Sequence, residues 1–273
     1  MTPSAQPGAP KIATPMTRAS DGGEPSPLPS LLVLTDRTQL PDGRTLKEQL
    51  GACIDGGARA VILREKDLPR SERVALARAV GALLAPVHGT LLVASDRVVA
   101  RQAGAHGVHL AEGDSPPDDG SLLWGRSCHT TGLTGADGCR YATLSPIFPS
   151  TSKPGYGPSF GLMGLALARG GIPLYALGGI DTPELAAACI AASAHGVAVM
   201  GALMRAPDPA ASVAAILAAV DPRSGTGVVR NPRSGTGVVR NRGRVHSDTG
   251  SAGTVHSDTD SGRTPSAPVR GAP

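Results

Sequence analysis

The chain has 273 residues and a formal net charge of +4 at pH 7. The arginine-rich segment 221–273 accounts for all of that charge, so the basic balance is no evidence for a nucleic-acid-binding groove in residues 1–220. We expect no nucleic-acid or membrane partner and interpret the basic tail as a solvated spacer, although such a tail could contact either. No apolar run reaches the roughly 20 residues of a membrane-spanning helix, and the four scattered cysteines form no Cys-x-x-Cys pair, which predicts a reduced, cytoplasmic protein without a zinc site.

The two ends of the chain differ in composition from its middle. Residues 1–29 are rich in Pro, Ser, Gly, Thr and Ala and contain no signal-peptide-like apolar run, which predicts a disordered extension. In residues 221–273, the segment 222–231 is repeated without change as 232–241, a period too short and polar for a solenoid. We therefore expect a low-complexity, disordered tail after a single folded domain at residues 30–220.

Short apolar runs alternate with alanine-rich helical stretches through this domain. The runs are continuously apolar, a pattern typical of parallel strands that are covered on both faces. In chain order we predict strands at 31–34, 59–63, 90–94, 107–110, 124–127, 141–144, 173–177 and 196–200, and helices at 45–56, 71–85, 97–103, 162–169, 183–192 and 209–220. This alternation of strands and helices predicts an α/β fold, a compact (β/α)8 TIM barrel.

The fifth unit of the predicted barrel is weaker than the others. Between His129 and Tyr141 the chain contains Gly132, Gly135 and Gly138. Each glycine costs a helix about 1 kcal/mol relative to alanine, so we expect the fifth helix to be short or frayed.

Charged residues directly follow the second strand, at the end where barrels of this kind carry their chemistry. Arg64 and Lys66 flank Glu65. Because alternate residues of an extended segment share a face, both cations can bind the same anion, although a solvated charge cluster would have the same sequence.

Two carboxylates follow neighbouring strands, Asp96 after the third and Asp114 after the fourth. Such a pair can hold Mg²⁺, which usually keeps several waters and is shared with substrate phosphates. Asp96 is also suited to cap the helix that begins at Arg97, and the two roles are compatible.

Three further loops at the same end are suited to phosphate. The loop 150–153 follows the sixth strand and supplies three hydroxyls and Lys153, although it is also compatible with a solvated Ser/Thr/Pro turn. Gly178-Gly179 and Met200-Gly201 follow the seventh and eighth strands, where these barrels usually bind phosphate through backbone N–H groups.

Two histidines lie near strand ends. We expect His109, within Val-His-Leu, to be a satisfied core residue. His129 follows Ser127 at the end of the fifth strand, where a neutral imidazole could move protons near pH 7.

With these residues assembled, the central region resembles the thiamine-phosphate synthase family, which includes the closely related thiazole tautomerases. The matching motifs are short, but they run in family order from residue 63 to residue 200. They are Leu63-Arg-Glu-Lys66, Ser95-Asp-Arg97, Gly107-Val-His-Leu110 with Asp114, Gly125-Arg-Ser-Cys-His129, Leu144-Ser-Pro-Ile-Phe-Pro149 through Lys153, Leu177-Gly-Gly-Ile180 and Gly196-Val-Ala-Val-Met200.

The resemblance implies a Mg²⁺-dependent transferase that joins hydroxymethylpyrimidine diphosphate to thiazole phosphate, releasing pyrophosphate and forming thiamine phosphate. Mg²⁺ on Asp96 and Asp114 would stabilise the departing negative charge, with help from the cations. The pyrimidine left behind is a stabilised cation that the thiazole nitrogen attacks, so no strong general base is required. The implied catalytic residues are Arg64, Lys66, Lys153, Ser127 and His129, and the implied substrate-binding residues are Ile62, Leu63, Glu65, Ser95, Ser150, Thr151, Ser152, Gly178, Gly179, Met200 and Gly201.

Some positions depart from the family pattern. Synthases usually carry Gln at Ile62 and Asn at Ser95, and losing a polar partner for the pyrimidine weakens discrimination. The Gly-Gln pair usual after strand four is Ala111-Glu112 here. Ile62 and the Gly-Arg-Ser-x-His motif are nearer to the tautomerases, whereas Asp114 and the Ser/Thr-Lys loop favour the synthases. We predict a synthase acting on small phosphate and diphosphate substrates; the alternatives are a tautomerase using His129 and a non-catalytic phosphate-binding relative.

Overall fold

The structure, a computed structural model, describes residues 28–117, 120–152, 155, 157–168 and 171–221. The predicted disorder of residues 1–27 and 222–273, and the predicted role of Lys153, lie outside the described residues. Leu28 and Pro29, which we assigned to the N-terminal extension, are bound to the barrel, because the Tyr175 hydroxyl contacts both carbonyl oxygens at 3.1 and 2.9 Å.

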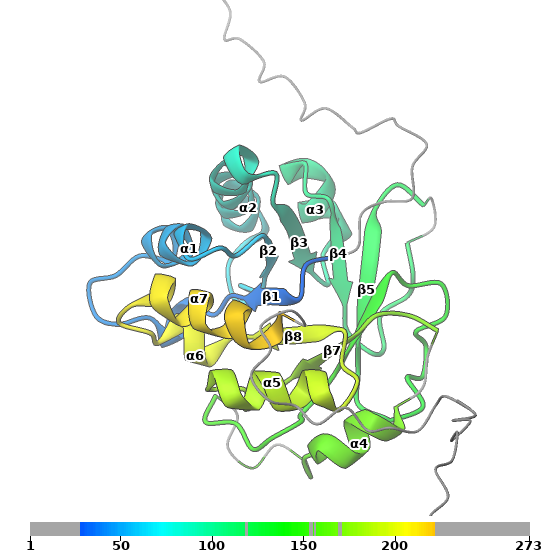
Figure 1. The fold of residues 1–273 in the computed structure, drawn as a ribbon. Coiled ribbons are helices and arrows are strands. Elements are labelled where there is room, and N and C mark those ends of the chain that lie inside the picture. Colours follow the sequence, from blue (N-terminus) through cyan, green and yellow to red (C-terminus); the bar gives the residue numbers. More distant parts are fainter. Residues whose placement is uncertain (1–27, 118–119, 153–154, 156, 169–170, 222–273) are drawn as a thin grey trace, which may run out of the picture. The chain divides into compact units, whose positions relative to one another are not determined.

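Eight parallel strands close into a barrel in which each strand pairs with its neighbours in sequence (Figure 1). The first and last strands complete the ring, with Leu31 opposite Val197. The predicted (β/α)8 barrel is therefore confirmed. The strands are β1 (Leu31–Leu34), β2 (Ala60–Leu63), β3 (Thr90–Ala94), β4 (Gly107–Leu110), β5 (Leu123–Cys128), β6 (Tyr141–Leu144), β7 (Leu174–Leu177) and β8 (Gly196–Val199).

Helices surround this ring of strands on the outside (Figure 1). They are α1 (Leu46–Asp55), α2 (Arg70–Leu84), α3 (Arg97–Ala103), α4 (Gly161–Leu167), α5 (Pro183–Ala191), α6 (Gly201–Met204) and α7 (Pro209–Val220), with 3-10 turns η1 (Arg37–Gln39) and η2 (Ala85–Val87). Helix α6 and the two 3-10 turns were not predicted, because elements of three or four residues are too short to display a helical period. No helix in the described part of the chain is long and apolar enough to cross a membrane.

Side-chain caps fix where several helices begin. Thr45 and Glu48 form a capping box at α1. The predicted cap at α3 is confirmed, since the Asp96 carboxylate accepts a hydrogen bond from the Val99 N–H. Thr182 and Asp208 cap α5 and α7 in the same way, and each such cap stabilises its helix by about 1 kcal/mol.

The connection between β5 and β6 contains no helix, which corrects the expectation of a short or frayed one. Residues 129–140 form only turns and bends. Gly135 and Gly138 adopt φ angles of 73° and 76°, in the left-handed region that no right-handed helix contains. The helical shell is therefore open on this side of the barrel, and the loops there need other support.

Strand side chains alternate between two cores. Leu31 and Val33 pack beneath the helices, whereas Leu32 and Leu34 belong to the cluster inside the barrel. Tyr141 and Tyr175 fill that interior with their rings edge to face. Gly125 faces Tyr141, and a Cβ at this position would collide with the ring. The interior is thus packed, which leaves the ends of the strands for a binding site.

Candidate active site

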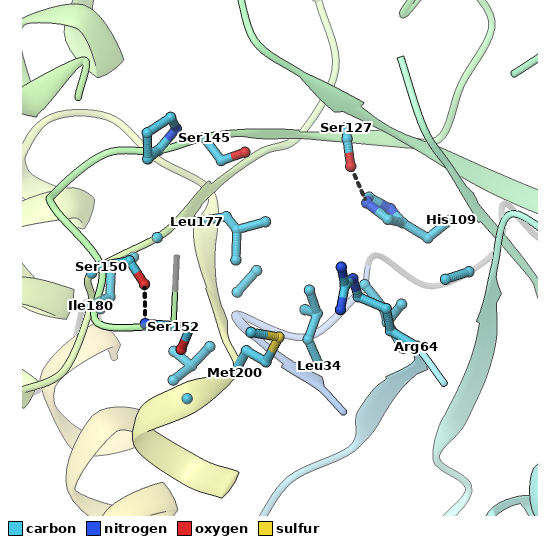
Figure 2. A pocket seen from close by; sticks show the side chains of 18 of the residues that line it. Leu34, Arg64, His109, Ser127, Ser145, Ser150, Ser152, Leu177, Ile180 and Met200 are labelled. Carbon is cyan, nitrogen blue, oxygen red and sulfur yellow. Dashed lines mark hydrogen bonds between the residues drawn. The ribbon is translucent and has the colours of Figure 1, made fainter. Parts of the chain in front are cut away.

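A pocket lies at the carboxyl ends of the strands and gathers most of the predicted site residues (Figure 2). Its floor is apolar, formed by interior residues that include Leu34, Ile62 and Ala94. The predicted residues that line it are Ile62, Arg64, Lys66, Ser95, Ser127, His129, Ser150, Ser152, Gly178, Gly179, Met200 and Gly201. Among the predicted residues that are described, Leu63, Glu65, Thr151, Asp96 and Asp114 lie outside this lining.

The segment after β2 orients its charges in alternate directions, as its extended conformation predicts. Arg64 and Lys66 both face the pocket. The Glu65 carboxylate faces away and is 3.0 Å from Nη1 of Arg37, and its side chain is only 1% exposed. Arg37 also binds Asp67, and the hydrogen bonds from Arg37 lower the pKa of Asp67. Glu65 thus contributes to the site by fixing the loop between the two cations.

The two candidate metal ligands are both held by other groups. Asp96 caps α3 with Oδ1, and its Oδ2 lies 3.1 Å from Nη2 of Arg73 and 3.6 Å from Nε of Arg70. Asp114 accepts a 2.8 Å hydrogen bond from the Ala111 N–H. No group of three or more His, Cys, Asp or Glu side chains within the described ranges could hold a metal ion. Any metal here would therefore need waters or substrate oxygens to complete its coordination.

The charge state of Asp114 follows from its surroundings. Partial burial raises the pKa of this carboxyl, but the pKa is lowered overall, and hydrogen bonds from the Ser95 side chain and the Ala111 N–H contribute to the lowering. The positive charges of Lys66 and Arg126 act in the same direction. Asp114 is therefore ionised near neutral pH and lies within the electrostatic reach of the pocket cation Lys66.

Arg126 supports the loop that carries Asp114, and its role was not predicted from the sequence. It is 3% exposed, and its guanidinium donates to three carbonyl oxygens: Ala111 at 3.0 Å, Glu112 at 2.5 Å and Asp114 at 2.7 Å. It also lies over the Trp124 ring, 5.6 Å from the centroid. Arg126 therefore fixes the β4–β5 loop and the backbone of Asp114. The sequence feature that could have identified it is the position of an arginine within a predicted barrel strand, because a buried charge needs partners.

A hydrogen-bond network holds the hydroxyl-rich loop after β6. Ser152 Oγ donates to Gln39 Oε1 at 2.8 Å, which ties the loop to η1. Arg205, which sequence analysis also missed, donates to Ser152 Oγ at 3.2 Å, to Thr151 Oγ1 at 3.0 Å and to Gln39 Oε1. The Ser152 N–H donates to Ser150 Oγ at 3.2 Å (Figure 2). Three hydroxyls and a guanidinium therefore form one hydrogen-bonded group, of which Ser150 and Ser152 line the pocket.

Glycines allow the backbone to approach this region closely. Gly179 has a φ angle of 66°, and a Cβ there would collide with the Pro149 carbonyl oxygen. A Cβ at Gly201 would collide with both Ser152 and Arg205. Gly179 is thus required by space as well as by conformation, whereas Gly201 lets the side chains of Ser152 and Arg205 pack against its backbone.

The two histidines differ in their hydrogen bonds. His109 is buried, with Nδ1 2.9 Å from the Tyr141 hydroxyl and Nε2 2.9 Å from Ser127 Oγ (Figure 2). Burial lowers the pKa of His109 to about 4, helped by the charges of Lys66 and Arg126, so its ring is neutral. His129 Nδ1 lies 2.9 Å from the Ser145 carbonyl oxygen. Because a carbonyl only accepts, Nδ1 of His129 carries a hydrogen, and Nε2 is the basic nitrogen of its neutral ring.

The buried His109 is expected to make the protein less stable in acid. Between pH 6.5 and about 4 the unfolded chain binds a proton that the folded protein excludes, so stability decreases as the pH falls through this range. The full effect is about 3 kcal/mol. Urea unfolding at pH 7 and pH 4.5 should show a smaller decrease in His109→Gln than in the original protein. The exposed control His88→Asn should retain the original decrease, and equal decreases in all three proteins would contradict the prediction.

Comparisons with known proteins point to one family for this chain. A family model described as thiamine monophosphate synthase matches residues 31–203. A putative thiamine-phosphate synthase from Geobacter sulfurreducens is 39% identical over 208 residues, which cover 71% of this chain and 96% of that protein. The thiamine-phosphate synthase of Roseiflexus sp. strain RS-1 is 35% identical over 225 residues, covering 75% of this chain and 94% of that protein.

A solved structure supports the same assignment. Thiamine phosphate pyrophosphorylase from Pyrococcus furiosus superimposes with a TM-score of 0.62 and is 25% identical in sequence. The superposition covers 70% of this chain and 95% of that one. The fold of the barrel is thus shared with this solved structure.

Proposed function

Because this chain belongs to the thiamine monophosphate synthase family, we propose that it joins hydroxymethylpyrimidine diphosphate to thiazole phosphate, forming thiamine phosphate and pyrophosphate. The observation that carries this proposal is the convergence of cations and hydroxyls on one pocket. Arg64 and Ser127 lie on one side of an apolar floor, and Ser150 and Ser152 on the other (Figure 2). Lys66 lines the same pocket. Two groups of anion-binding residues across one pocket suit two phosphorylated substrates.

The first group would act on the bond that breaks. As the diphosphate leaves its carbon, negative charge develops on the leaving oxygens, and Arg64 and Lys66 would stabilise it. The Ser127 hydroxyl would add a neutral donor, and Lys153 a further charge. The pyrimidine ring would lie on the floor of Leu34, Ile62 and Ala94, where apolar side chains keep water from the cation that forms.

Magnesium fits the donor chemistry of the neighbouring loops. Asp96 and Asp114 follow the adjacent strands β3 and β4, and carboxylate oxygens are preferred Mg²⁺ ligands. These two residues would hold the ion, which would supply positive charge to the leaving diphosphate. Arg126 would keep the Asp114 backbone in place, and Arg73 would orient Asp96.

The second group would hold the thiazole phosphate. Ser150, Thr151 and Ser152 offer hydroxyls, and Gly179 and Gly201 line the same pocket with backbone that carries no side chain of its own. Arg205 already binds Thr151 and Ser152, so it would keep their oxygens in place as the phosphate arrives. This would direct the thiazole nitrogen toward the carbon that the diphosphate leaves.

Proton transfer on the thiazole is a second candidate function, favoured by His129. Its Nε2 is the basic nitrogen of the neutral ring, and the residue lines the pocket. The apolar Ile62 also lacks the hydrogen-bonding groups of the glutamine that synthases usually carry there. A thiazole tautomerase would use His129 as its proton shuttle and would need no metal.

One assay separates these functions. With Mg²⁺ and both substrates, the purified protein should form thiamine phosphate, and EDTA or Lys153→Ala should abolish the product. The same preparation is offered a thiazole carboxylate phosphate without metal, with His129→Ala as the matched variant. Isomerisation that His129→Ala abolishes, without any thiamine phosphate formation, would replace the synthase by the tautomerase. Absence of both products would contradict both functions.

The cysteines support a cytoplasmic location for this activity, which we also propose. Cys53, Cys128, Cys139 and Cys189 are all free and buried. Thiols are kept reduced in the cytosol, whereas disulfides are common in secreted proteins.

A further inference from the structure

A buried series of three side chains leads from the barrel interior to the pocket. The Tyr141 hydroxyl is 2.9 Å from His109 Nδ1, and His109 Nε2 is 2.9 Å from Ser127 Oγ. Tyr141 is fully buried, His109 nearly so, and Ser127 lines the pocket. At first sight the Ser127–His109 pair resembles a nucleophile with its base.

The hydrogen bonds assign the tautomer of His109 and argue against that interpretation. The neutral ring carries one hydrogen, on either Nδ1 or Nε2. Within the described part of the chain, His109 is the sole hydrogen-bond partner of the Tyr141 hydroxyl. If Nδ1 carried the hydrogen, the Tyr141 hydroxyl would have to accept it, and its own hydrogen would be buried without an acceptor. The satisfied arrangement has Tyr141 donating to Nδ1 and Nε2–H donating to Ser127.

This arrangement fixes the direction of the Ser127 hydroxyl. Because Ser127 Oγ accepts from Nε2–H, its own hydrogen cannot point at His109 and is available to the pocket. A serine that donates its hydrogen to a ligand acts as an anion-binding group. A serine that donates to a histidine would act as a nucleophile.

Packing holds the series in place. The rings of His109 and Tyr141 are stacked with centroids 5.5 Å apart, and Tyr175 contacts Tyr141 edge to face. Gly125, opposite the Tyr141 ring, supplies the space that the ring needs. Neither ring can rotate out of its hydrogen bonds without disturbing the packed interior.

We propose that Tyr141 and His109 are positioning residues that keep Ser127 as a preset hydrogen-bond donor to the departing diphosphate. The proposal rests on the proposed synthase function for the identity of the anion. It goes beyond that function in assigning a role to Tyr141 and to His109, whose two ring nitrogens are already engaged by Tyr141 and Ser127.

The first test reads the tautomer directly. A long-range ¹H–¹⁵N NMR spectrum of the full chain, with labelled histidine, distinguishes protonated from bare ring nitrogens. We expect the His109 hydrogen on Nε2, with the signals assigned by their loss in His109→Gln. A hydrogen on Nδ1 would overturn the proposal. This result does not depend on turnover, so it stands or fails separately from the proposed function.

The second test asks whether Tyr141 acts through Ser127. Tyr141→Phe should weaken binding of inorganic pyrophosphate with Mg²⁺, and lower kcat/KM, by about tenfold. In the Ser127→Ala background, Tyr141→Phe should have no further effect, because its influence passes through the missing hydroxyl. Tyr175→Phe is the matched control, since its hydroxyl contacts the Leu28 and Pro29 carbonyls instead, and it should leave both quantities unchanged.

Each outcome of this cycle has a definite meaning. Equal losses from Tyr141→Phe with and without Ser127 would show a general structural effect and overturn the proposal. If the original protein forms no thiamine phosphate, the proposed function fails, and the pyrophosphate-binding cycle then decides the positioning role alone. Thermal unfolding of every variant shows whether a loss reflects misfolding.

Discussion

Replacing Asp114 with asparagine is expected to lower the rate of thiamine phosphate formation about a thousandfold while leaving the fold intact. Asparagine has nearly the same shape, and its amide oxygen can still accept the hydrogen bond from the Ala111 N–H. It removes the negative charge that lies near Lys66 and that would bind Mg²⁺. The apparent Mg²⁺ affinity should decrease together with the rate.

The measurement is the initial rate over a Mg²⁺ titration, with Mg²⁺ binding in the presence of pyrophosphate followed separately by calorimetry. Asp137→Asn is the matched control, because Asp137 is an exposed acid on the β5–β6 loop. It should match the original protein in both measurements. An Asp114→Asn protein with an unchanged Mg²⁺ dependence would remove Asp114 from the proposed metal site.

Replacing Arg126 with methionine is expected to destabilise the protein by about 3 kcal/mol. Methionine retains part of the apolar volume beside Trp124 but leaves the Ala111, Glu112 and Asp114 carbonyls without their charged donor. Because no helix supports the β5–β6 side, no neighbouring element replaces these hydrogen bonds. The β4–β5 loop should loosen, and Asp114 should lose its position.

Urea unfolding measures the stability change, and limited proteolysis measures the opening of the loop. Arg126→Lys should recover only part of the stability, because one ammonium cannot reproduce the planar fork that serves three carbonyls. The control Arg78→Met removes a single exposed bond to the Gln102 carbonyl and should change stability by less than about 0.5 kcal/mol. A stable, protease-resistant Arg126→Met protein would contradict the proposed support of the loop.

The strands could be predicted because most are short, continuous apolar runs, and the observed bounds differ from the prediction by at most one residue at each end. Helix propensity alone could not show that the connection between β5 and β6 contains no helix at all. Gly135 and Gly138 do more than weaken a helix, since their φ angles exclude it. The local sequence therefore suggested a weak helix between β5 and β6 but could not predict the turns that take its place.

The positions of candidate site residues were predictable where they follow from the local conformation of one segment. Alternation along an extended segment placed Arg64 and Lys66 on one face. Partners distant in sequence were not predictable: Glu65 meets Arg37 across 28 residues, and Arg205 meets Gln39 across 166. Such contacts arise only when the barrel closes, and this is why Arg126 and Arg205 were missed.

Asp96 has a structural role and a proposed metal-binding role, and the two make opposing demands on its carboxylate. One of its oxygens starts α3, the other pairs with Arg73 of α2, and the same carboxylate is a proposed ligand of the metal. If Asp96 holds Mg²⁺ as proposed, a stronger ion pair between Arg73 and this carboxylate would stabilise the contact between α2 and α3 and would also compete with the ion. Under that proposal, replacing Arg73 would trade stability of the helical shell against Mg²⁺ affinity at Asp96.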